Sequence, residues 1–174
     1  MKEDLEGNIE EMKKYLKKLD ESGLYDAEKY SRSLLHQTSQ SSYFYCSLVK
    51  DGSPSDTYYH VHKRPKEHQM AYFNIGRGFP KELMDGHWCY VVKDLGYKML
   101  IIPCTSIKKE SSPVNPHFEK DLTVLDEHGM ITHSRMQLTD LRTVDIQRLD
   151  CRKPFYNVCD DQEEIRKFII EHLF

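Results

Sequence analysis

The chain has 174 residues, a formal net charge of -3 at pH 7 and a hydrophobic fraction of 39%, values typical of one folded domain with room for an appendage. The weakly acidic balance argues against a global basic field, so any contact with nucleic acid has to come from a local patch. The five cysteines form no C-x-x-C pair, which argues against a zinc ribbon and a disulfide framework, and no apolar run reaches the length of a membrane span. We therefore expect a cytoplasmic protein with reduced thiols and no membrane partner.

Residues 2–21 form the first predicted element, because apolar side chains recur there at alternating steps of four and three. This heptad seam is too short for a freestanding coiled coil. It predicts an amphipathic helix that ends near Gly23 and packs on another helix or on its own domain. The seam consists of Leu5, Ile9, Met12, Leu16 and Leu19.

A second helix is expected from Asp26 to about Gln37, and the polar stretch from His36 to Ser42 is then a connector with little to bury. We place a boundary there, with a helical extension in 1–42 and a barrel domain in 43–174. Beyond it the sequence changes to short β-branched and aromatic runs separated by turn residues, which is typical of a small, strongly bent sheet or barrel. The runs are YFYCSLV, TYYHVH, MAYFNI, WCYVV, KMLIIPCT and DLTVL.

The last segment, DDQEEIRKFIIEHLF, predicts a C-terminal helix that closes the sheet. Asp160 is the expected N-cap and Glu163 follows three residues later, as in a capping box. The predicted fold is therefore mainly β with helices, a small barrel between an N-terminal helical segment and a C-terminal helix. The apolar face of the last helix is expected to contain Ile165, Phe168, Ile169 and either Leu173 or Phe174.

The hairpin GHWCYVVKDLGYKMLIIPCTSIK, Gly86 to Lys108, has two strands that are apolar at successive positions. Both faces of Val91–Val92 and Met99–Ile102 are therefore expected to be covered. Pro103 ends regular ladder pairing. Thr105-Ser106 then offers hydroxyl and backbone N–H groups that suit an anionic oxygen. From spacing alone, a simple Ser/Thr turn is the favoured interpretation of this pair.

Residues from about Tyr72 to Arg148 resemble the MazF/PemK family of toxin endoribonucleases, and the match covers a little under half of the chain. The order and spacing of four pieces agree with the family pattern. They are AYFNIG with a following loop that contains Gly78, Pro80, Lys81 and Glu82; GHWCYVV, where the family has G-H-R-P and an apolar strand; IIPCTS, at a V-P-x-T-[ST] strand end; and SRMQLTDLRTVDIQRL, at a late S-x-x-x-x-D-Q-x-R-T-I-D-x-x-R segment.

This resemblance implies an SH3-like barrel of the MazF/CcdB type, usually a homodimer, that cleaves single-stranded RNA without a metal or cofactor and is neutralised by a cognate antitoxin. Related gyrase-poisoning toxins have a similar architecture and are not nucleases. The alternative is therefore a non-catalytic barrel that binds RNA, gyrase or a protein partner, and a third interpretation is a regulatory domain that shares only the architecture. The N-terminal helices could fill the antitoxin groove, support dimerisation or extend the core, and we prefer core extension.

Metal-free RNA cleavage needs a proton acceptor for the 2'-hydroxyl, a donor for the 5'-oxygen and positive or N–H groups around the phosphorane. The resemblance implies that Thr105, with Ser106, holds the phosphate. His87 matches the family histidine and is a candidate general acid or base, because histidine titrates near neutrality. A partly exposed strand histidine that contacts nothing catalytic is an interpretation of nearly equal weight. The family arginine falls on Trp88 and its proline on Cys89, and tryptophan cannot neutralise a phosphate. Another cation is needed, or activity is lost.

Arg77, in the glycine-flanked turn GRG, is the predicted replacement, because the glycines permit close approach and the planar guanidinium suits a phosphate. An ordinary solvated loop arginine is an equally weighted interpretation. Lys81 in the same loop is the reserve cation. Glu82 is a candidate partner base or antitoxin contact, although a plain surface carboxylate is favoured.

The late segment supplies candidate RNA contacts in Ser134 and Gln137. Asp140 is displaced by one residue from the acidic position of the family pattern, which on a strand would reverse its face, so it is a weaker candidate for the substrate-binding set. Arg142 and Arg148 are predicted to form structural ion pairs.

Histidines recur in TYYHVHKRPKEH, where His60 and His62 would share one strand face, with His68 nearby and Cys89 as a conceivable fourth ligand. The spacing matches no standard zinc site, so we predict a solvated histidine face and no metal. The cations of Lys63 to His68 with the tyrosines around them also form a weak nucleic-acid pattern.

Overall fold

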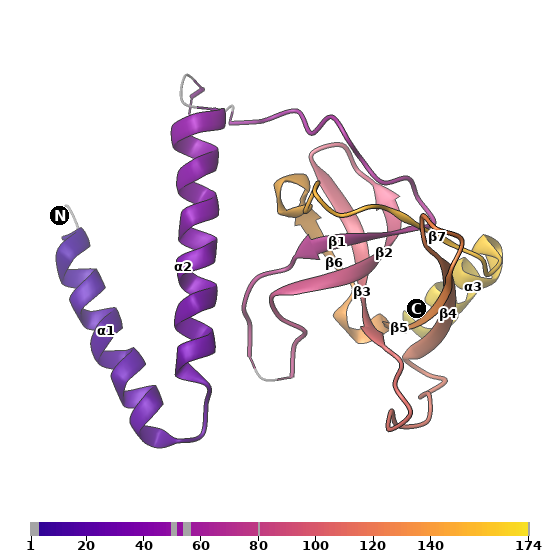
Figure 1. Ribbon diagram of the computed structural model, residues 1–174, viewed down its shortest axis with the longest axis horizontal. Coiled ribbons are helices and arrows are strands. Elements are labelled where there is room, and N and C mark those ends of the chain that lie inside the picture. Colours follow the sequence, from indigo (N-terminus) through magenta and orange to yellow (C-terminus); the bar gives the residue numbers. More distant parts are fainter. Residues whose placement is uncertain (1–3, 50–51, 54–56, 80, 174) are drawn as a thin grey trace. The chain divides into compact units, whose positions relative to one another are not determined.

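The computed structural model describes residues 4–49, 52–53, 57–79 and 81–173. Pro80 and Phe174, which the sequence analysis assigned to a loop and to a helix face, lie outside these ranges. The chain divides into two compact units, 1–57 and 58–174, so the division comes later than the predicted boundary at residue 42. Each unit is described by itself (Figure 1).

The first unit is a pair of helices. Helix α1 spans Leu5–Ser22, helix α2 spans Ala27–Tyr43, and a π-helical turn, η1, follows at Phe44–Leu48. The carboxylate of Asp26 accepts a hydrogen bond from the Lys29 N–H at 2.7 Å and caps α2. Gly23, at φ 64°, adopts the left-handed conformation that ends α1, as predicted.

Two predictions for this unit were wrong. The stretch from His36 to Ser42 belongs to α2, and YFYCSLV forms the end of α2 and the π-helical turn instead of a strand. The chain has no Gly or Pro between Gly23 and Gly52 to stop a helix. Polar side chains are also satisfied along the helix, since the Thr38 hydroxyl donates to the Leu34 carbonyl at 2.9 Å.

Within the first unit α1 buries no residue, and Leu5 at its start is 73% exposed. Core extension by the N-terminal helices stays a prediction. The helix itself forms where the heptad pattern predicted it. Among the described residues, no helix has the length and apolar character needed to cross a membrane.

In its described residues, the second unit has seven strands in one antiparallel sheet. The pairings β1–β2, β2–β3, β3–β5, β5–β4, β4–β7 and β7–β1 close a six-stranded ring, which confirms the predicted small barrel with helices at both ends of the chain. The strands are β1 Gln69–Asn74, β2 Gly86–Asp94, β3 Lys98–Ser106, β4 Glu119–Leu125, β5 Ile131–Gln137, β6 Arg142–Asp145 and β7 Tyr156–Val158.

Strand β3 has two partners in succession along one edge. Lys98 to Ile101 pair with β6, and Cys104 to Ser106 pair with β5. A 3-10 turn, η2 at Leu138–Asp140, makes the corner between β5 and β6, and a second one, η3 at Ile146–Arg148, follows β6. The end of β3 is therefore fixed between β2 and β5.

Two clusters of buried side chains cover opposite faces of the central hairpin. Val91 and Met99 belong to the first cluster, and Tyr90 and Ile102 belong to the second. This confirms that both faces of these strands are covered. Cluster one contains Val61, Ala71, Phe73, Ile75, Cys89, Val91, Met99, Ile101, Val144, Ile146 and Leu149; cluster two contains Met70, Tyr90, Ile102, Cys104, Leu122, Val124, Met136, Leu138, Val158, Ile165 and Ile169.

Helix α3, Gln162–Leu173, adds Ile165 and Ile169 to the second cluster, as predicted. Its cap differs by one residue from the prediction. Asp161 accepts from the Glu164 N–H at 2.9 Å, whereas the Asp160 carboxylate accepts from the Thr123 N–H at 2.7 Å and ties the start of the helix to β4.

The run TYYHVH, residues 57–62, was wrongly predicted as a strand. This segment forms no strand. Its apolar residue Val61 packs in the first cluster, and a glutamine side chain, in place of a neighbouring strand, bonds to one of its backbone carbonyls. The Gln147 carboxamide donates to the Tyr59 carbonyl at 2.6 Å.

Candidate functional site

A row of polar side chains crosses neighbouring strands of the barrel. Thr105 on β3 pairs with Arg135 on β5, and Gln137 on β5 pairs with Glu119 on β4. Residues directly opposite in an antiparallel pair share a face. The intervening Cys104 and Met136 belong to the second core cluster, so the row lies on the opposite face of the sheet.

His87 on β2 extends this row. Its ring atom Nδ1 lies 3.2 Å from the carbonyl oxygen of Cys104, the residue that precedes Thr105. A carbonyl can only accept, so Nδ1 carries the proton and the lone pair of the neutral ring is on Nε2. The structure therefore brings together an imidazole with proton-accepting capacity and the strand end that carries Thr105.

The Thr105 hydroxyl is held by a chain of side chains. Gln137 Nε2 lies 3.1 Å from Glu119 Oε1 and, in a long and weak bond, 3.4 Å from Thr105 Oγ1. Both N–H groups of the Gln137 carboxamide therefore donate hydrogen bonds, and the Thr105 hydroxyl oxygen accepts one of them. The hydrogen of the Thr105 hydroxyl is left for donation to a bound oxygen.

Arg135 is the charged residue that the described barrel buries, at 7% exposure. Its guanidinium donates to both oxygens of Asp121, at 2.7 and 3.1 Å, and to the Ser112 carbonyl at 2.6 Å. The hydrogen bond to Asp121 raises the pKa of Arg135. Because Asp121 and, at 3.8 Å, Glu119 balance the charge, Arg135 fixes the loop after β3 and adds little net positive field.

Thr105, Glu119, Arg135 and Gln137 line a groove of about 340 Å³, whereas His87 and Asp121 are not among its lining residues. The volume is many times the roughly 30 Å³ of one water molecule. Lys108 contributes the other cation of its lining and is exposed. The Lys108 N–H donates to the Ser111 hydroxyl at 2.9 Å, which shapes the loop beside the groove. The lining consists of Thr105, Ser106, Ile107, Lys108, Ser111, Ser112, Glu119, Arg135 and Gln137.

Cys104 takes no part in this groove, although it adjoins Thr105. Its side chain lies in the second core cluster, and burial raises the pKa of its thiol to about 12. A thiol rather than a thiolate is present at neutral pH, so Cys104 is not a nucleophile.

Ser106 lines the groove, but its partner Ser134 does not. Ser134 lies between Arg135 and His133 on β5 and also pairs with Leu122 of the second core cluster. Side chains alternate along a strand, so the Ser134 hydroxyl is directed to the face opposite Thr105.

The predicted residues of the loop between β1 and β2 bond within that loop. Arg77 Nε lies 3.0 Å from Asp85 Oδ1, and the Arg77 side chain is 8% exposed. The Glu82 carboxylate accepts from the Phe79 N–H at 3.0 Å, and Lys81 is exposed. The guanidinium that strand pairing sets beside Thr105 is that of Arg135, and the sequence analysis had assigned this part to Arg77.

Asp140 joins this loop to the barrel. Its Oδ1 accepts from the Leu83 N–H at 3.0 Å and from Arg142 Nη2 at 2.8 Å. It lies in the turn η2 and not on a strand, so the argument that a one-residue displacement would reverse its face does not apply. The ion pair predicted for Arg142 is confirmed.

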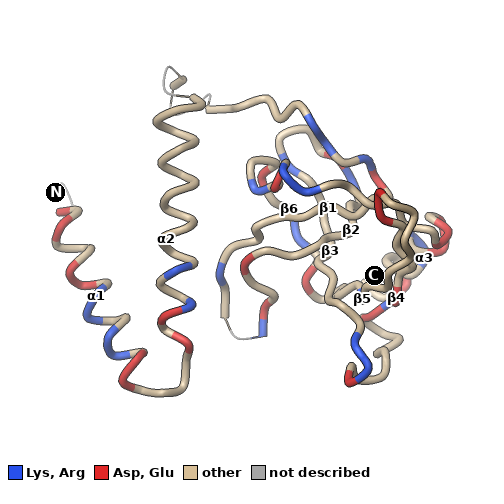
Figure 2. The backbone as a smooth tube through the Cα atoms, viewed as in Figure 1, with Lys and Arg blue, Asp and Glu red and all other residues tan. Residues whose placement is uncertain are grey.

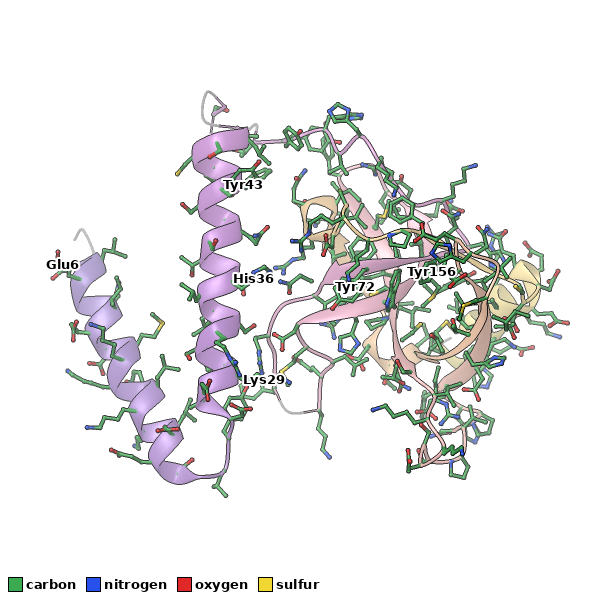
Figure 3. The ribbon with its side chains drawn as sticks, viewed as in Figure 1. Glu6, Lys29, His36, Tyr43, Tyr72 and Tyr156 are labelled. Carbon is green, nitrogen blue, oxygen red and sulfur yellow. The ribbon has the colours of Figure 1, made fainter. Side chains whose placement is uncertain are left out.

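Trp88, which the resemblance sets at an arginine position, belongs to an aromatic cluster on the other face of β2. Its ring stacks on Tyr156 with centroids 4.4 Å apart and meets Tyr72 edge-on at 5.6 Å; both tyrosines are labelled on the barrel in Figure 3. Lys153 Nζ lies 5.7 Å from the Tyr72 ring. The indole fills space between strands and offers no charge to the groove.

The histidines of residues 60–68 are dispersed. The rings of His60 and His62 lie 5.5 Å apart, while His68 Nδ1 lies 3.0 Å from the Tyr90 hydroxyl. Among the residues that the structure describes, no three His, Cys, Asp or Glu side chains are grouped as a metal ion requires.

Sequence reasoning missed Arg135, Glu119 and Lys108. Arg135 stands between two residues that were selected, Ser134 and Gln137, and Lys108 closely follows Ser106, so proximity to the motifs was a usable signal for both. Nothing in the sequence marks Glu119, since its role depends on pairing with Gln137.

No protein-family model matches this chain, and no curated protein matches it significantly. Fold and site together therefore define its class as a small antiparallel barrel with a polar groove at the end of β3.

Proposed function

We propose that this protein is a toxin-type endoribonuclease that cleaves single-stranded RNA in the cytoplasm without a metal. The observation that carries the proposal is the contact of the His87 imidazole with the carbonyl of Cys104, the residue that precedes Thr105. The ordered motifs that resemble MazF/PemK toxins support it, because they include both residues.

The reaction begins with attack of the 2'-hydroxyl on the adjacent phosphorus and leaves a 2',3'-cyclic phosphate and a 5'-hydroxyl. His87 Nε2 has the lone pair that accepts the 2'-hydroxyl proton. The Thr105 hydroxyl, oriented by Gln137, and the Ser106 backbone donate to the phosphorane oxygens. Solvent supplies the proton for the leaving 5'-oxygen.

Positive charge in this proposal comes from Lys108. Arg135 is engaged by Asp121, and Arg77 is paired with Asp85, whereas the exposed residue Lys108 lines the groove together with Thr105. An ammonium near the phosphorane stabilises its added negative charge. Lys108 therefore takes the electrostatic role that the sequence analysis gave to Arg77.

Two partners follow from the resemblance and belong to the same proposal. The family pattern implies a cognate antitoxin that blocks the RNA groove and a homodimer of barrels. Glu82 and Lys81, exposed in the loop between β1 and β2, are the candidate antitoxin contacts.

The test is incubation of the purified chain with a mixed-sequence single-stranded RNA in EDTA. We expect discrete fragments that end in a cyclic phosphate, identified by mass spectrometry. Thr105→Ala is expected to lower the cleavage rate by about 10²- to 10³-fold, as for loss of one phosphorane donor. His87→Ala is expected to lower it by about 10²- to 10⁴-fold.

Thr132→Ala is the matched control, since Thr132 is exposed on β5 and does not line the groove. Its cleavage rate should equal that of the unaltered chain. Equal loss in Thr132→Ala and Thr105→Ala would contradict the proposal, and so would cleavage that survives in the Thr105 and His87 variants.

The second candidate is a barrel that binds RNA, gyrase or another protein without cutting it. Its support is the packing of Trp88 against Tyr156 and Tyr72, which leaves an uncharged ring where the family has arginine. Intact RNA throughout the EDTA assay, with RNA retained by the protein in a filter-binding measurement, would favour this binder.

A further inference from the structure

The apolar seam of α1 is left open on one flank. A groove of about 430 Å³ separates α1 from α2, and the two helices diverge from their connection (Figure 1). Leu5, Ile9 and Met12 are 73%, 39% and 43% exposed. The groove is lined by Asn8, Glu11, Met12, Tyr15, Leu16, Leu19, Tyr30 and Leu34, so α2 approaches the side of Asn8 and Tyr15 and leaves the side of Leu5 and Ile9 uncovered.

The charges of α1 are divided along its length. The first turns of α1 are acidic, the next turns are basic and the last turn is acidic again, as Figure 2 shows. A parallel copy of the helix would set acidic turns against acidic turns, whereas an antiparallel copy sets acidic turns against basic ones. The acidic residues of the first turns are Asp4, Glu6, Glu10 and Glu11, the basic residues are Lys13, Lys14, Lys17 and Lys18, and the acidic residues of the last turn are Asp20 and Glu21.

Helix α2 does not match this pattern. It has no Asp, Glu, Lys or Arg from Ser33 to its end at Tyr43. A second copy of α1 in the antiparallel orientation offers a matching apolar seam, with its basic turns opposite the acidic first turns.

One antiparallel register satisfies both the seam and the charges. Leu5 meets Leu16 of a second copy and Ile9 meets Met12 of that copy, with the same contacts repeated by symmetry. The residues that follow Leu5 and Met12 on the open flank are Glu6 and Lys13. In this register Glu6 faces Lys13 of the second copy across the seam, at the flanking positions that set partner choice in coiled coils.

We propose that the open flank of α1 is an association surface for a second copy of this chain, with the two α1 helices antiparallel. The association buries Leu5, Ile9 and Met12, and the Glu6–Lys13 contacts set its direction. It is independent of the RNA groove and of the barrel dimer that belongs to the proposed function, because it requires only residues of the first unit.

The first test is sedimentation equilibrium of the full chain and of a matched pair of variants. Ile9→Gln removes a seam residue, and Lys14→Gln changes the opposite side of the same helix to the same residue. We expect a concentration-dependent dimer, a dissociation constant raised about tenfold or more by Ile9→Gln because apolar burial is lost, and a change below about twofold for Lys14→Gln. Far-ultraviolet circular dichroism should be equal for all three, since both positions are exposed.

The second test exchanges the charges. Glu6→Lys sets two ammonium groups against each other at each contact, and Lys13→Glu sets two carboxylates against each other, so each variant alone should associate several-fold more weakly. In a heterodimer from an equimolar mixture of the two variants, each of the two contacts joins an ammonium group of the Glu6→Lys chain to a carboxylate of the Lys13→Glu chain. Opposite charges are thereby restored at both contacts, so the heterodimer should form more readily than either homodimer. A monomer at every concentration, a dimer unaffected by Ile9→Gln, or a mixture no better than either variant alone would overturn the proposal.

Discussion

Thr105 and Cys104 are neighbours on β3, but their side chains lie on opposite faces of the sheet in different environments. Strand alternation directs the thiol into the second core cluster, where burial raises its pKa to about 12. The Thr105 hydroxyl instead lies on the face that carries Gln137, Arg135 and His87. A shift of β3 by one residue against β5 would exchange the two side chains, so the site depends on strand register as much as on residue identity.

The residue pair Arg64–Asp94 shows how a single ion pair in the barrel couples stability to pH. The Arg64 guanidinium donates to the Asp94 carboxylate at 3.2 and 2.6 Å, and the Gly96 N–H donates to it at 2.8 Å. Burial alone would raise the pKa of Asp94, but the hydrogen bonds from Arg64 and Gly96 lower it. A carboxyl whose pKa is lower in the folded state stabilises the fold above its unfolded pKa, and this contribution is lost as pH falls through the folded value.

We therefore expect Asp94→Asn to lower the free energy of unfolding by roughly 1 kcal/mol at pH 7, a value that allows for solvent screening of the partly exposed pair. The difference should shrink as pH falls below about 4, near the pKa of an unfolded aspartate. Urea unfolding at pH 7 and pH 3 measures both. Asp20→Asn, on the exposed face of α1, should change neither value, and an Asp94→Asn deficit that persists undiminished at pH 3 would rule the explanation out.

At the scale of elements, backbone hydrogen bonds continue the pairing of β1 and β2 into the base of the loop between them. The Ile75 N–H donates to the Asp85 carbonyl at 2.8 Å, and the Asp85 N–H donates to the Gly76 carbonyl at 2.6 Å. Gly76 is at φ 83°, a conformation that glycine adopts without strain. Asp140 then fixes the far side of the loop to the turn η2.

Removal of that anchor should loosen the loop. Asp140→Ala takes away the acceptor for the Leu83 N–H and the partner of Arg142, so we expect trypsin to cleave after the exposed Lys81 several-fold faster, because local opening exposes the backbone. Asp140→Asn keeps an oxygen for Leu83 and should give an intermediate rate. Asp145→Ala, which removes the cap of η3, is the control, and equal cleavage in Asp140→Ala and Asp145→Ala would contradict the assigned role.

The sequence correctly predicted strands for runs that are apolar on both faces. It failed for segments whose secondary structure is determined by packing against the rest of the unit. WCYVV and KMLIIPCT are strands because both core clusters need them. YFYCSLV has the same residue types but follows a helix that nothing interrupts, so it stays helical. Strand β5, ITHSRMQ, alternates polar side chains and was absent from the predicted runs.

The same limit explains the candidate site. Thr105, His87 and Gln137 were found because they belong to local motifs. Glu119 and Arg135 were missed as partners because cross-strand pairing, which sets Glu119 opposite Gln137 and Arg135 opposite Thr105, has no local signature in the sequence. The glycine neighbours of Arg77 suggested that it binds a phosphate. Its ion pair with Asp85 depends on the folded conformation of the loop, which the sequence does not give.

At the scale of the whole molecule, the hydrophobic core belongs to one unit. Every residue of both core clusters lies in 58–174, while in the described part of 1–57 the one buried side chain is Ala27. The barrel ring is closed by strands of the second unit alone. Stability should therefore reside in the second unit, because apolar burial is the main favourable contribution to folding.

We expect a fragment of residues 58–174 to fold by itself. Its urea unfolding, followed by Tyr and Trp fluorescence, should be cooperative, with about the same midpoint as the full chain, since the transition reports loss of the same core. The full chain should have a stronger circular dichroism signal at 222 nm than the fragment, because it contains α1 and α2. This additional signal should be lost at a lower urea concentration than the barrel signal, because α1 buries no side chain. A fragment that lacks a cooperative transition, or a full chain whose helices and barrel unfold together at one midpoint, would show that the first unit contributes to the stability of the barrel.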